Sequence, residues 1–302
     1  MPGIDQYTKL LLHMDGDRSS TIGGNDSYTK LLLHMDTTPF VDDSHEIFPV
    51  TNNNVTINTS IKKFGGGSGY FNGSSAYLSV PDSDNFDFGS SDFTIDLWVR
   101  ISNISSNNPL VSQTDNASSN ISFRLFYASN NVLRFGYSTD GTNLVENNRT
   151  WIPTANIWHH VAVTRNGTVG KIFVDGTQIG ANIDFTGITL YNSSSDLKIG
   201  NDWPGNNYFG GFMDEIRLSN GIARWTSNFT PPTEPYSPNY ISGNMNYDGR
   251  IIVLRESDWS VVHNEMHTGG SYIASGLGSD NVTALFRRSN GKSMCYGNIS
   301  PQ

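Results

Sequence analysis

Phe93-Thr-Ile-Asp-Leu-Trp-Val-Arg100 is a stretch in which phenyl and aliphatic side chains alternate with threonine, aspartate, tryptophan and arginine. Successive side chains of a β-strand point to opposite faces of the sheet, so a period of two predicts a strand with one face in a core. No window of 12 residues elsewhere in the sequence carries a convincing 3.6-residue period. The chain is therefore predicted to be all-β.

Turn signals separate further short strands along the chain. Asn166-Gly167 lies between predicted strands at 158–165 and 171–174, and Asn-Gly is the strongest two-residue signal for a hairpin. Asn130-Asn131 marks another hairpin in the same way. Short strands at even spacing with turn signals between them are typical of a β-sandwich or jelly roll.

The composition agrees with short strands and polar turns. Hydrophobic residues make up 36% and charged residues 16% of the chain, and Asn, Ser, Thr and Gly fill the difference. These four residue types form helices poorly and favour turns. The formal net charge of −9 repels phosphate backbones, so nucleic acid is not an expected partner.

The N-terminal segment and the cysteine content limit the compartment and the site chemistry. Leu10-Leu-Leu12 is too short for the apolar core of a signal peptide, and no basic region precedes it. No apolar run reaches 18 residues, so membrane insertion is not expected. Cys295 is the only cysteine, which excludes an intramolecular disulfide and a cysteine-based zinc site. A virion or extracellular location fits a protein released by lysis.

The N-terminus contains the same strand twice, because the sequence of residues 7–15 is repeated at residues 28–36. One jelly roll has one place for that strand, so residues 1–27 are predicted to form an arm carrying the spare copy. A spare strand exposes unpaired N–H and C=O groups, which favours pairing with another chain or a sheet edge and hence a homo-oligomer. The alternative is a recent duplication whose extra copy lies along its own domain.

A proline-rich linker is predicted at residues 226–239, which include Pro231-Pro232 and Pro238. Such a segment is stiff and extended and typically marks a domain boundary. The predicted domains are therefore the main sandwich at 28–225 and a small β-sandwich at 240–302, where the strand pattern restarts. A sandwich of that size is marginal alone, so we expect it to be docked or assembled.

Residues 28–225 resemble the laminin-G-like, concanavalin A-like jelly rolls, through seven sequence blocks in order. The resemblance implies two curved antiparallel sheets, ligand binding at loops or on the concave face, and often a structural calcium. Variants that open with the first block look like those of phage virion and tail proteins. The blocks are Leu31-Leu-Leu-His-Met-Asp36, Lys63-Phe-Gly65 with Gly69-Tyr-Phe-Asn-Gly73, Tyr77-Leu-Ser-Val-Pro81, Asp92-Phe-Thr-Ile-Asp-Leu-Trp-Val99, Trp158-His-His-Val-Ala-Val163, Phe173-Val-Asp-Gly176 and Gly211-Phe-Met-Asp-Glu-Ile-Arg217.

The C-terminal piece is similar to small carboxypeptidase-regulatory-like sandwiches, which have an immunoglobulin-like or transthyretin-like fold. The residues that carry this similarity are Asp248-Gly249 before Arg250-Ile-Ile-Val253, and Gly270-Ser-Tyr-Ile-Ala-Ser-Gly-Leu277. Modules of this type usually serve as spacers or assembly domains.

Glycoside hydrolysis is the natural enzymatic alternative on a jelly roll. It needs two carboxylates roughly 5–9.5 Å apart. Hydrolases of this fold typically carry the strand pattern E-x-D-x-x-E, which this sequence lacks. Asp214 and Glu215 are consecutive, so a strand would point them to opposite faces. The chain is therefore not expected to be an enzyme.

Asp214 is the first candidate metal ligand. Alternation places it on the apolar face of its strand with Phe212, Ile216 and Leu218, and a buried carboxylate needs a cation or several hydrogen-bond donors. The first interpretation is a calcium site shared with Asp36, because calcium prefers carboxylate and carbonyl oxygens. The alternative is a structural aspartate that accepts backbone N–H groups from the turn at residues 72–73.

Trp203, Asn206 and Tyr208 are the candidate ligand-binding residues, in the loop Asn201-Asp-Trp-Pro-Gly-Asn-Asn-Tyr208. Binding concentrates on loops that a rigid scaffold holds, and an exposed tryptophan with polar neighbours can stack on a sugar. The alternative is a turn that packs onto its own sheet. The polar loops at 112–120 and 138–148 are of the same kind.

Together these features predict a virion structural protein of a bacteriophage, either a capsid decoration subunit or a tail-associated subunit such as a tail fibre. Its lectin-like domain would serve assembly and attachment to surface glycan on the host. The expected partners are other virion proteins, copies of itself and that glycan. A free extracellular carbohydrate-binding module is the second hypothesis, and a glycoside hydrolase is the third.

Overall fold

The computed structural model describes residues 25–44, 46–115, 120–202 and 207–236 with their side chains, and the backbone of four further strands between residues 240 and 299. The chain divides into two compact units, of which one is Asn25–Pro238 and the other contains the four C-terminal strands. The N-terminal arm at residues 1–24 lies outside the described residues, so its predicted role in assembly stays a prediction.

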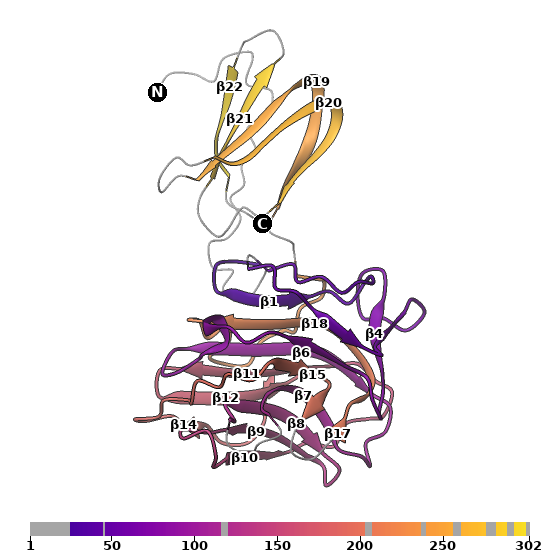
Figure 1. The fold of residues 1–302 in the computed structure, drawn as a ribbon, viewed down its shortest axis with the longest axis vertical. Helices are drawn as coiled ribbons and strands as arrows, with labels where there is room; N and C mark the ends of the chain where they lie inside the picture. The colour runs from indigo at the N-terminus through magenta and orange to yellow at the C-terminus, as the bar shows by residue number, and fades with distance from the viewer. Residues whose placement is uncertain are drawn as a thin grey trace. The chain divides into compact units, whose positions relative to one another are not determined.

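The first unit is built around a nine-stranded antiparallel sheet, called the first sheet (Figure 1). Seven of its strands follow one another across the sheet, and two further strands pair beside this main path. These two are β1 (Thr29–Leu33), which pairs with β18, and β14 (Ile183–Asp184), which pairs with β12. The main path runs β13 (Thr177–Gln178), β12 (Val169–Val174), β11 (His159–Asn166), β6 (Phe93–Ile101), β18 (Gly210–Asn220), β4 (Ser68–Asn72), β3 (Thr56–Asn58).

A seven-stranded antiparallel sheet, the second sheet, completes the sandwich. The two antiparallel sheets and the absence of α-helix from the described residues confirm the all-β prediction. A 3-10 turn, η1 (Asp84–Phe86), and a small hairpin of β16 (Asn201–Asp202) and β17 (Asn207–Tyr208) accompany the sheets. The order is β10 (Val145–Thr150), β9 (Val132–Tyr137), β8 (Phe123–Ala128), β7 (Asn108–Gln113), β15 (Leu197–Ile199), β5 (Tyr77–Val80), β2 (Thr51–Asn53).

The core lies between the two sheets and follows the period of two. Phe93, Ile95 and Leu97 of β6 are fully buried in it. Phe123 and Leu125 of β8 also lie in it, and each exposes at most 1% of its surface. Burying such side chains contributes about 1.5–3 kcal/mol each relative to exposure. The alternation of the sequence thus sets which face of each strand meets the core.

The outer face of the first sheet is covered as well. Asp96 on β6 and Arg217 on β18 are fully buried there, with Arg217 Nε 3.0 Å from Asp96 Oδ1. The Tyr236 hydroxyl donates to Asp96, and the Arg217 guanidinium lies 3.7 Å from the centre of the Tyr236 ring. Residues after β18 therefore fold back over the sheet, and the described part of the predicted linker belongs to this covering layer.

An aromatic stack strengthens the same layer. The rings of Trp225 and Phe229 stack at 4.1 Å, and Trp225 packs on Phe173 and Ala162 of the first sheet. The backbone N–H of Tyr236 also donates to Glu215 Oε2 at 2.8 Å. Residues 226–236 of the predicted linker thus pack on the jelly roll, and the compact unit Asn25–Pro238 includes them.

The second copy of the repeated strand fills the place beside β18. Leu31, Leu32 and Leu33 of β1 are fully buried, and Leu33 pairs with Ile216. The first copy, at residues 7–15, lies outside the described residues.

The described part of the C-terminal unit is one four-stranded antiparallel sheet. Its order is β20 (Val261–Ser275), β19 (Tyr240–Arg255), β21 (Val282–Arg288), β22 (Ser293–Ile299). The sheet agrees with an all-β module, while the resemblance to transthyretin-like sandwiches stays a prediction. In the part of the chain that the structure describes, no helix is long and apolar enough to cross a membrane.

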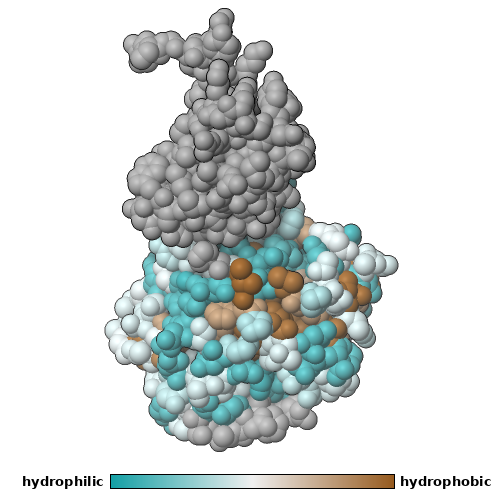
Figure 2. Space-filling view, turned by 45° about the horizontal axis from the view of Figure 1, so that its top comes forward, coloured by the Kyte–Doolittle hydropathy of each residue, from teal (hydrophilic) through white to brown (hydrophobic). Residues whose placement is uncertain are grey.

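The surface of the jelly-roll unit is mainly polar. In the face that Figure 2 shows, a small group of hydrophobic residues lies among hydrophilic ones. Among the described residues, the large hydrophobic side chains that are at least half exposed are Val41, Ile47, Ile152 and Ile157. A polar surface of this kind favours ligands that are held by hydrogen bonds.

The buried ion pair yields a test of the covering layer. Burial alone would raise the pKa of Asp96, but Arg217 and His160 outweigh it and lower the pKa to about 2. Asp96→Ala removes the buried carboxylate that faces the Arg217 charge, so it should lower the free energy of unfolding by about 3–5 kcal/mol in urea denaturation. Lys30→Ala, which breaks the Lys30–Glu46 pair at the surface, should cost less than about 1 kcal/mol. Equal losses in the two variants would contradict this account.

Candidate functional site

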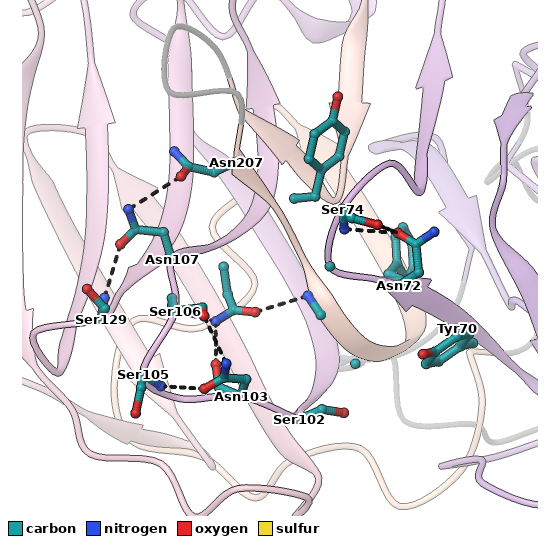
Figure 3. A pocket seen from close by; sticks show the side chains of 16 residues that line it. Tyr70, Asn72, Ser74, Ser102, Asn103, Ser105, Ser106, Asn107, Ser129 and Asn207 are labelled. Carbon is teal, nitrogen blue, oxygen red and sulfur yellow. Dashed lines mark hydrogen bonds between the residues drawn. The ribbon is translucent and has the colours of Figure 1, made fainter.

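A cavity of about 720 Å³ opens at one end of the sandwich, among the loops that join the two sheets (Figure 3). Its walls come from the β4–β5 turn, the loop between β6 and β7, the β8–β9 turn, β17 and the first residues of β18. The volume lies in the range of about 300–1,000 Å³ that is usual for small-molecule sites. We call this cavity the end pocket, and its lining is Tyr70, Phe71, Asn72, Gly73, Ser74, Ser102, Asn103, Ser105, Ser106, Asn107, Asn108, Ser129, Asn207, Tyr208, Gly210 and Gly211.

The lining contains five asparagines and five serines and no charged side chain. An asparagine amide offers two donor hydrogens and an acceptor oxygen, and a serine hydroxyl both donates and accepts. Such a surface suits a ligand with many hydroxyl groups and no formal charge. None of the lining residues is a carboxylate, histidine, lysine or cysteine, which are the side chains that most often serve as general acid, general base or strong nucleophile.

Asn108 at the start of β7 anchors one wall of the end pocket. Its side chain is buried, and its Nδ2 donates to the carbonyl oxygens of Asn103 at 3.0 Å and Ser106 at 2.7 Å. Its Oδ1 accepts the backbone N–H of Gly210 at 3.1 Å. The side-chain amide of Asn108 therefore fixes the β6–β7 loop against Gly210, the first residue of β18.

Asn107 connects three segments at the rim (Figure 3). Its Oδ1 accepts the backbone N–H of Ser129 in the β8–β9 turn at 3.2 Å. Its Nδ2 lies 3.4 Å from Asn207 Oδ1 on β17, a long hydrogen bond. The rim residues thus hold one another in place before a ligand arrives, which lowers the entropy lost on binding.

The β4–β5 turn closes the opposite wall. Asn72 Oδ1 accepts the backbone N–H groups of Ser74, Ser75 and Ala76 at 2.9–3.0 Å. Gly73 has a φ of 75°, and a Cβ there would lie 3.5 Å from the Cα of Gly210. A Cβ at this distance would make an ordinary van der Waals contact, so it is the left-handed backbone that favours glycine here.

Two tyrosines bring aromatic rings to the lining. Tyr208 is half-buried, with its ring centre 6.3 Å from that of Tyr77. Tyr70 is 40% exposed and packs on Phe212 at 5.2 Å between ring centres. An aromatic ring with a polar tip combines apolar contact area with a hydrogen-bonding hydroxyl.

The predicted ligand-binding loop therefore contributes to the end pocket in part. Tyr208 lines it, whereas Trp203 and Asn206 lie outside the described residues, so their role stays a prediction. The lining residues of the β6–β7 loop were not predicted from the sequence. The run at 102–108, which contains only serine, asparagine and one isoleucine between two strands, was the signal that could have identified them.

The candidate metal ligands Asp36 and Asp214 lie against one loop, at residues 61–67. Asp36 Oδ1 accepts the backbone N–H groups of Gly66 at 2.7 Å and Gly67 at 2.9 Å. Asp214 Oδ2 accepts those of Lys63 at 2.8 Å and Phe64 at 3.1 Å. The two carboxylates thus hold the loop over the first sheet. The donors to Asp214 come from this loop and not from the turn at residues 72–73.

The expectation that Asp214 shares a face with Ile216 and Leu218 is wrong, because a β-bulge interrupts β18. The register with β6 shifts between Asp214 and Arg217, and Glu215 at the bulge has a φ of 48°. Ile216 and Leu218 face the core, whereas Asp214 pairs with Trp98 on the outer face. The bulge inserts one residue and so reverses the alternation of the strand.

Asp214 is fully buried, and burial raises the pKa of its carboxyl to about 7. The N–H groups of Phe64 and Lys63 lower the pKa, while Glu215 and Asp36 raise it further. Asp214 Oδ1 has no hydrogen-bond partner within the described part of the chain. A proton on that oxygen would satisfy this environment at neutral pH.

Calcium fits this arrangement poorly. It takes six to eight oxygen ligands, and amide N–H groups point their positive ends at both carboxylates. Within residues 25–236 as described, no group of three or more histidines, cysteines and acids is placed to hold a metal ion. Calcium at Asp36 and Asp214 therefore stays a prediction.

A sequence model of the concanavalin A-like lectin/glucanases superfamily matches residues 72–225. The match confirms the laminin-G-like, concanavalin A-like resemblance, and it spans every lining segment of the end pocket except residues 70 and 71. A search of curated proteins finds no match to the chain.

Solved structures with a similar fold include toxin binding domains. The binding domain of Paraclostridial mosquitocidal protein 1 has a TM-score of 0.54 at 13% identity, over 90% of this chain and 74% of that one. The botulinum neurotoxin serotype C1 binding domain has a TM-score of 0.51 at 15% identity, over 89% and 73%. The binding domain of botulinum neurotoxin DC, solved in complex with rat synaptotagmin II, has a TM-score of 0.50 at 16% identity, over 89% of this chain and 73% of that one. At these identities the likeness shows the fold alone.

The raised pKa of Asp214 predicts a pH dependence of stability. A carboxyl whose pKa is about 7 in the folded chain and about 4 in the unfolded chain stabilises the fold below pH 4. That stabilisation is lost as the pH rises through 7, by at most about 4 kcal/mol. Asp214→Asn should therefore flatten the decline of the melting temperature between pH 4 and pH 7, the range bounded by the two pKa values.

The same melting experiment tests calcium. If an ion binds at Asp36 and Asp214, a chelator lowers the melting temperature of the wild-type protein and leaves that of Asp214→Asn unchanged. A chelator without effect on the wild type refutes the ion. If the melting temperature of Asp214→Asn depends on pH as strongly as that of the wild-type protein, the titration of Asp214 is refuted.

Proposed function

The chain belongs to the concanavalin A-like lectin/glucanase superfamily, and on this premise we propose that its jelly roll binds uncharged carbohydrate in the end pocket. The observation that carries the proposal is the lining of amides, hydroxyls and tyrosine rings without a single charge. Sugar hydroxyls pair with groups that both donate and accept, and a sugar ring can pack on an aromatic face. The protein acts by binding and not by catalysis.

The absence of charged side chains from the lining of the end pocket determines which class of sugar we propose as its ligand. A sialylated or sulfated glycan would place an anion among neutral groups, on a chain whose formal net charge is −9. Burying an unpaired charge is unfavourable because no cation of the lining compensates its lost hydration. The tip of the neighbouring hairpin, residues 203–206, is also uncharged in sequence. The pocket is therefore proposed to select neutral saccharides.

We further propose that the chain is a bacteriophage virion structural protein, a capsid decoration or tail-associated subunit that attaches to glycan on the host surface. The resemblance of Leu31-Leu-Leu-His-Met-Asp36 to virion and tail proteins supports this. The identical copy near the N-terminus supports assembly, because one copy already fills the place beside β18. The proposed partners are copies of the chain and other virion proteins. A free extracellular carbohydrate-binding module is the alternative.

The end pocket can be tested with matched substitutions. Asn107→Ala and Tyr208→Ala should each weaken binding of uncharged gluco-, manno- or galacto-oligosaccharides about tenfold, since each removes hydrogen bonds or ring contact worth roughly 1–1.5 kcal/mol. Asn143→Ala and Tyr191→Ala lie outside the lining and should leave the affinity unchanged. Isothermal titration calorimetry gives the affinities. Equal binding of sialylated oligosaccharides, or no effect of the two pocket variants, would contradict the proposal.

The arm is tested by deletion of residues 1–24. The truncated chain should lose the oligomer that the full chain forms, because the spare strand supplies the edge-to-edge pairing. Light scattering coupled to size exclusion measures the mass. Leu11→Asp in the full chain is the milder variant and should weaken assembly in the same direction. A full chain that is monomeric at all concentrations, or a truncated chain of unchanged stoichiometry, would favour the free binding module.

A further inference from the structure

The β16–β17 hairpin brings Asn207 and Tyr208 to the end pocket, and its other strand lies on the second sheet. Asp202 of β16 is the register partner of Asn207 of β17. Directly opposite residues of an antiparallel pair point to the same face, so both side chains leave the hairpin on one side. Asn207 reaches Asn107 at the pocket rim, while Asp202 reaches Arg124 on β8.

The hairpin is fastened to one row of residues that crosses the second sheet. Ser112 of β7, Arg124 of β8 and Gly136 of β9 are neighbours in that row, and Glu146 of β10 follows. Arg124 points away from the core, because its neighbours Phe123 and Leu125 are core residues. The row therefore lies on the outer face of the second sheet.

Two residues of this row hold β16. The Ser112 hydroxyl donates to the carbonyl oxygen of Asn201 at 2.9 Å, and both groups are buried. Arg124 Nη1 donates to Asp202 Oδ2 at 2.9 Å, and Asp202 is only 1% exposed. Charge-assisted bonds of this length are among the stronger hydrogen bonds in proteins.

Arg124 is itself held in place from the other side. Its Nε donates to Glu146 Oε1 at 3.0 Å across β9. The residue between them in the row is Gly136, where a Cβ would lie 3.1 Å from Glu146 Oε1. Glycine at this position leaves room for the guanidinium and the carboxylate to meet over the middle strand.

Asp202 carries its charge at neutral pH in spite of its burial. Burial raises the pKa of its carboxyl to about 6, and Arg124 acts in the opposite direction. Glu146 adds to the rise, and Lys198 on β15 opposes it. The ion pair between Asp202 and Arg124 therefore fastens β16 at physiological pH, beside the hydrogen bond from Ser112 to Asn201.

From these contacts we propose that Asp202, Arg124 and Glu146 form a latch that positions the β16–β17 hairpin, and through Asn207 sets the affinity of the end pocket for its saccharide. Asp202 is a positioning residue, because it does not line the pocket and acts through its register partner. The effect on affinity rests on the proposed carbohydrate binding, while the effect on the hairpin does not.

A double-mutant cycle tests the latch with the uncharged gluco-, manno- or galacto-oligosaccharide that the wild-type protein binds most tightly. Asp202→Ala should weaken binding about tenfold, because Asn207 is no longer held at the rim. In an Asn207→Ala background the same change should weaken binding clearly less than in the wild type, since one of the two pocket residues on β17 through which it acts is gone. Asp82→Ala is the matched control and should leave the affinity unchanged, because Asp82 bonds Gln113 and lies outside the lining.

Hydrogen exchange measured without ligand separates this inference from the proposed function. Asp202→Ala should speed exchange of the Asn207 and Phe209 amides at least tenfold and leave the amides of β6 unchanged. If Asp202→Ala fails to fold, Arg124→Lys replaces it, because lysine keeps the charge but cannot bridge both carboxylates. Unchanged exchange at Asn207 and Phe209, or additive losses of affinity in the cycle, overturns the latch. Faster exchange in a protein whose wild type binds no saccharide supports the latch and refutes only the proposed function.

Discussion

Asp96 of β6 and Arg217 of β18 form an ion pair between adjacent strands, and neither side chain is exposed. The rest of the jelly roll depends on keeping this ion pair buried. A buried charge without a partner is strongly unfavourable, so the pair requires a cover that also satisfies its remaining hydrogen-bonding groups. The segment that ends at Tyr236 provides this cover and packs Trp225 on the sheet beside it. The first sheet is thereby buried on both faces around this ion pair.

This burial decides which surfaces remain for a ligand. The outer face of the first sheet around Asp96 and Arg217 is covered by its own chain, which leaves the outer face of the second sheet and the loops at the ends of the strands. At the end pocket, Asn108 and Asn107 fix the loops to one another, and the Asp202–Arg124 pair ties the adjoining hairpin to the second sheet. A rigid scaffold with fixed polar loops suits recognition of a ligand by hydrogen bonds.

Local alternation and turn signals made the strands predictable, and the polar loop around Trp203 indicated Tyr208, which lines the end pocket. The position of Asp214 could not be predicted in the same way, because the bulge at Glu215 reverses the alternation without a signature in the sequence. The end pocket was also out of reach, since its lining comes from five segments that only the antiparallel order of the sheets brings together. The cover of the first sheet was hidden for a related reason. A segment with several prolines is typical of an extended linker, whereas here the long-range contacts of Tyr236 hold it on the sheet.

The proposed ligand of the end pocket is an uncharged saccharide. A crystal structure of the protein soaked with a neutral oligosaccharide that it binds in solution tests this most directly. The account predicts sugar density between the β6–β7 loop and β17, with sugar hydroxyls within hydrogen-bond distance of Asn107 and Asn207. Density at another surface, with the end pocket filled only by water, would contradict it.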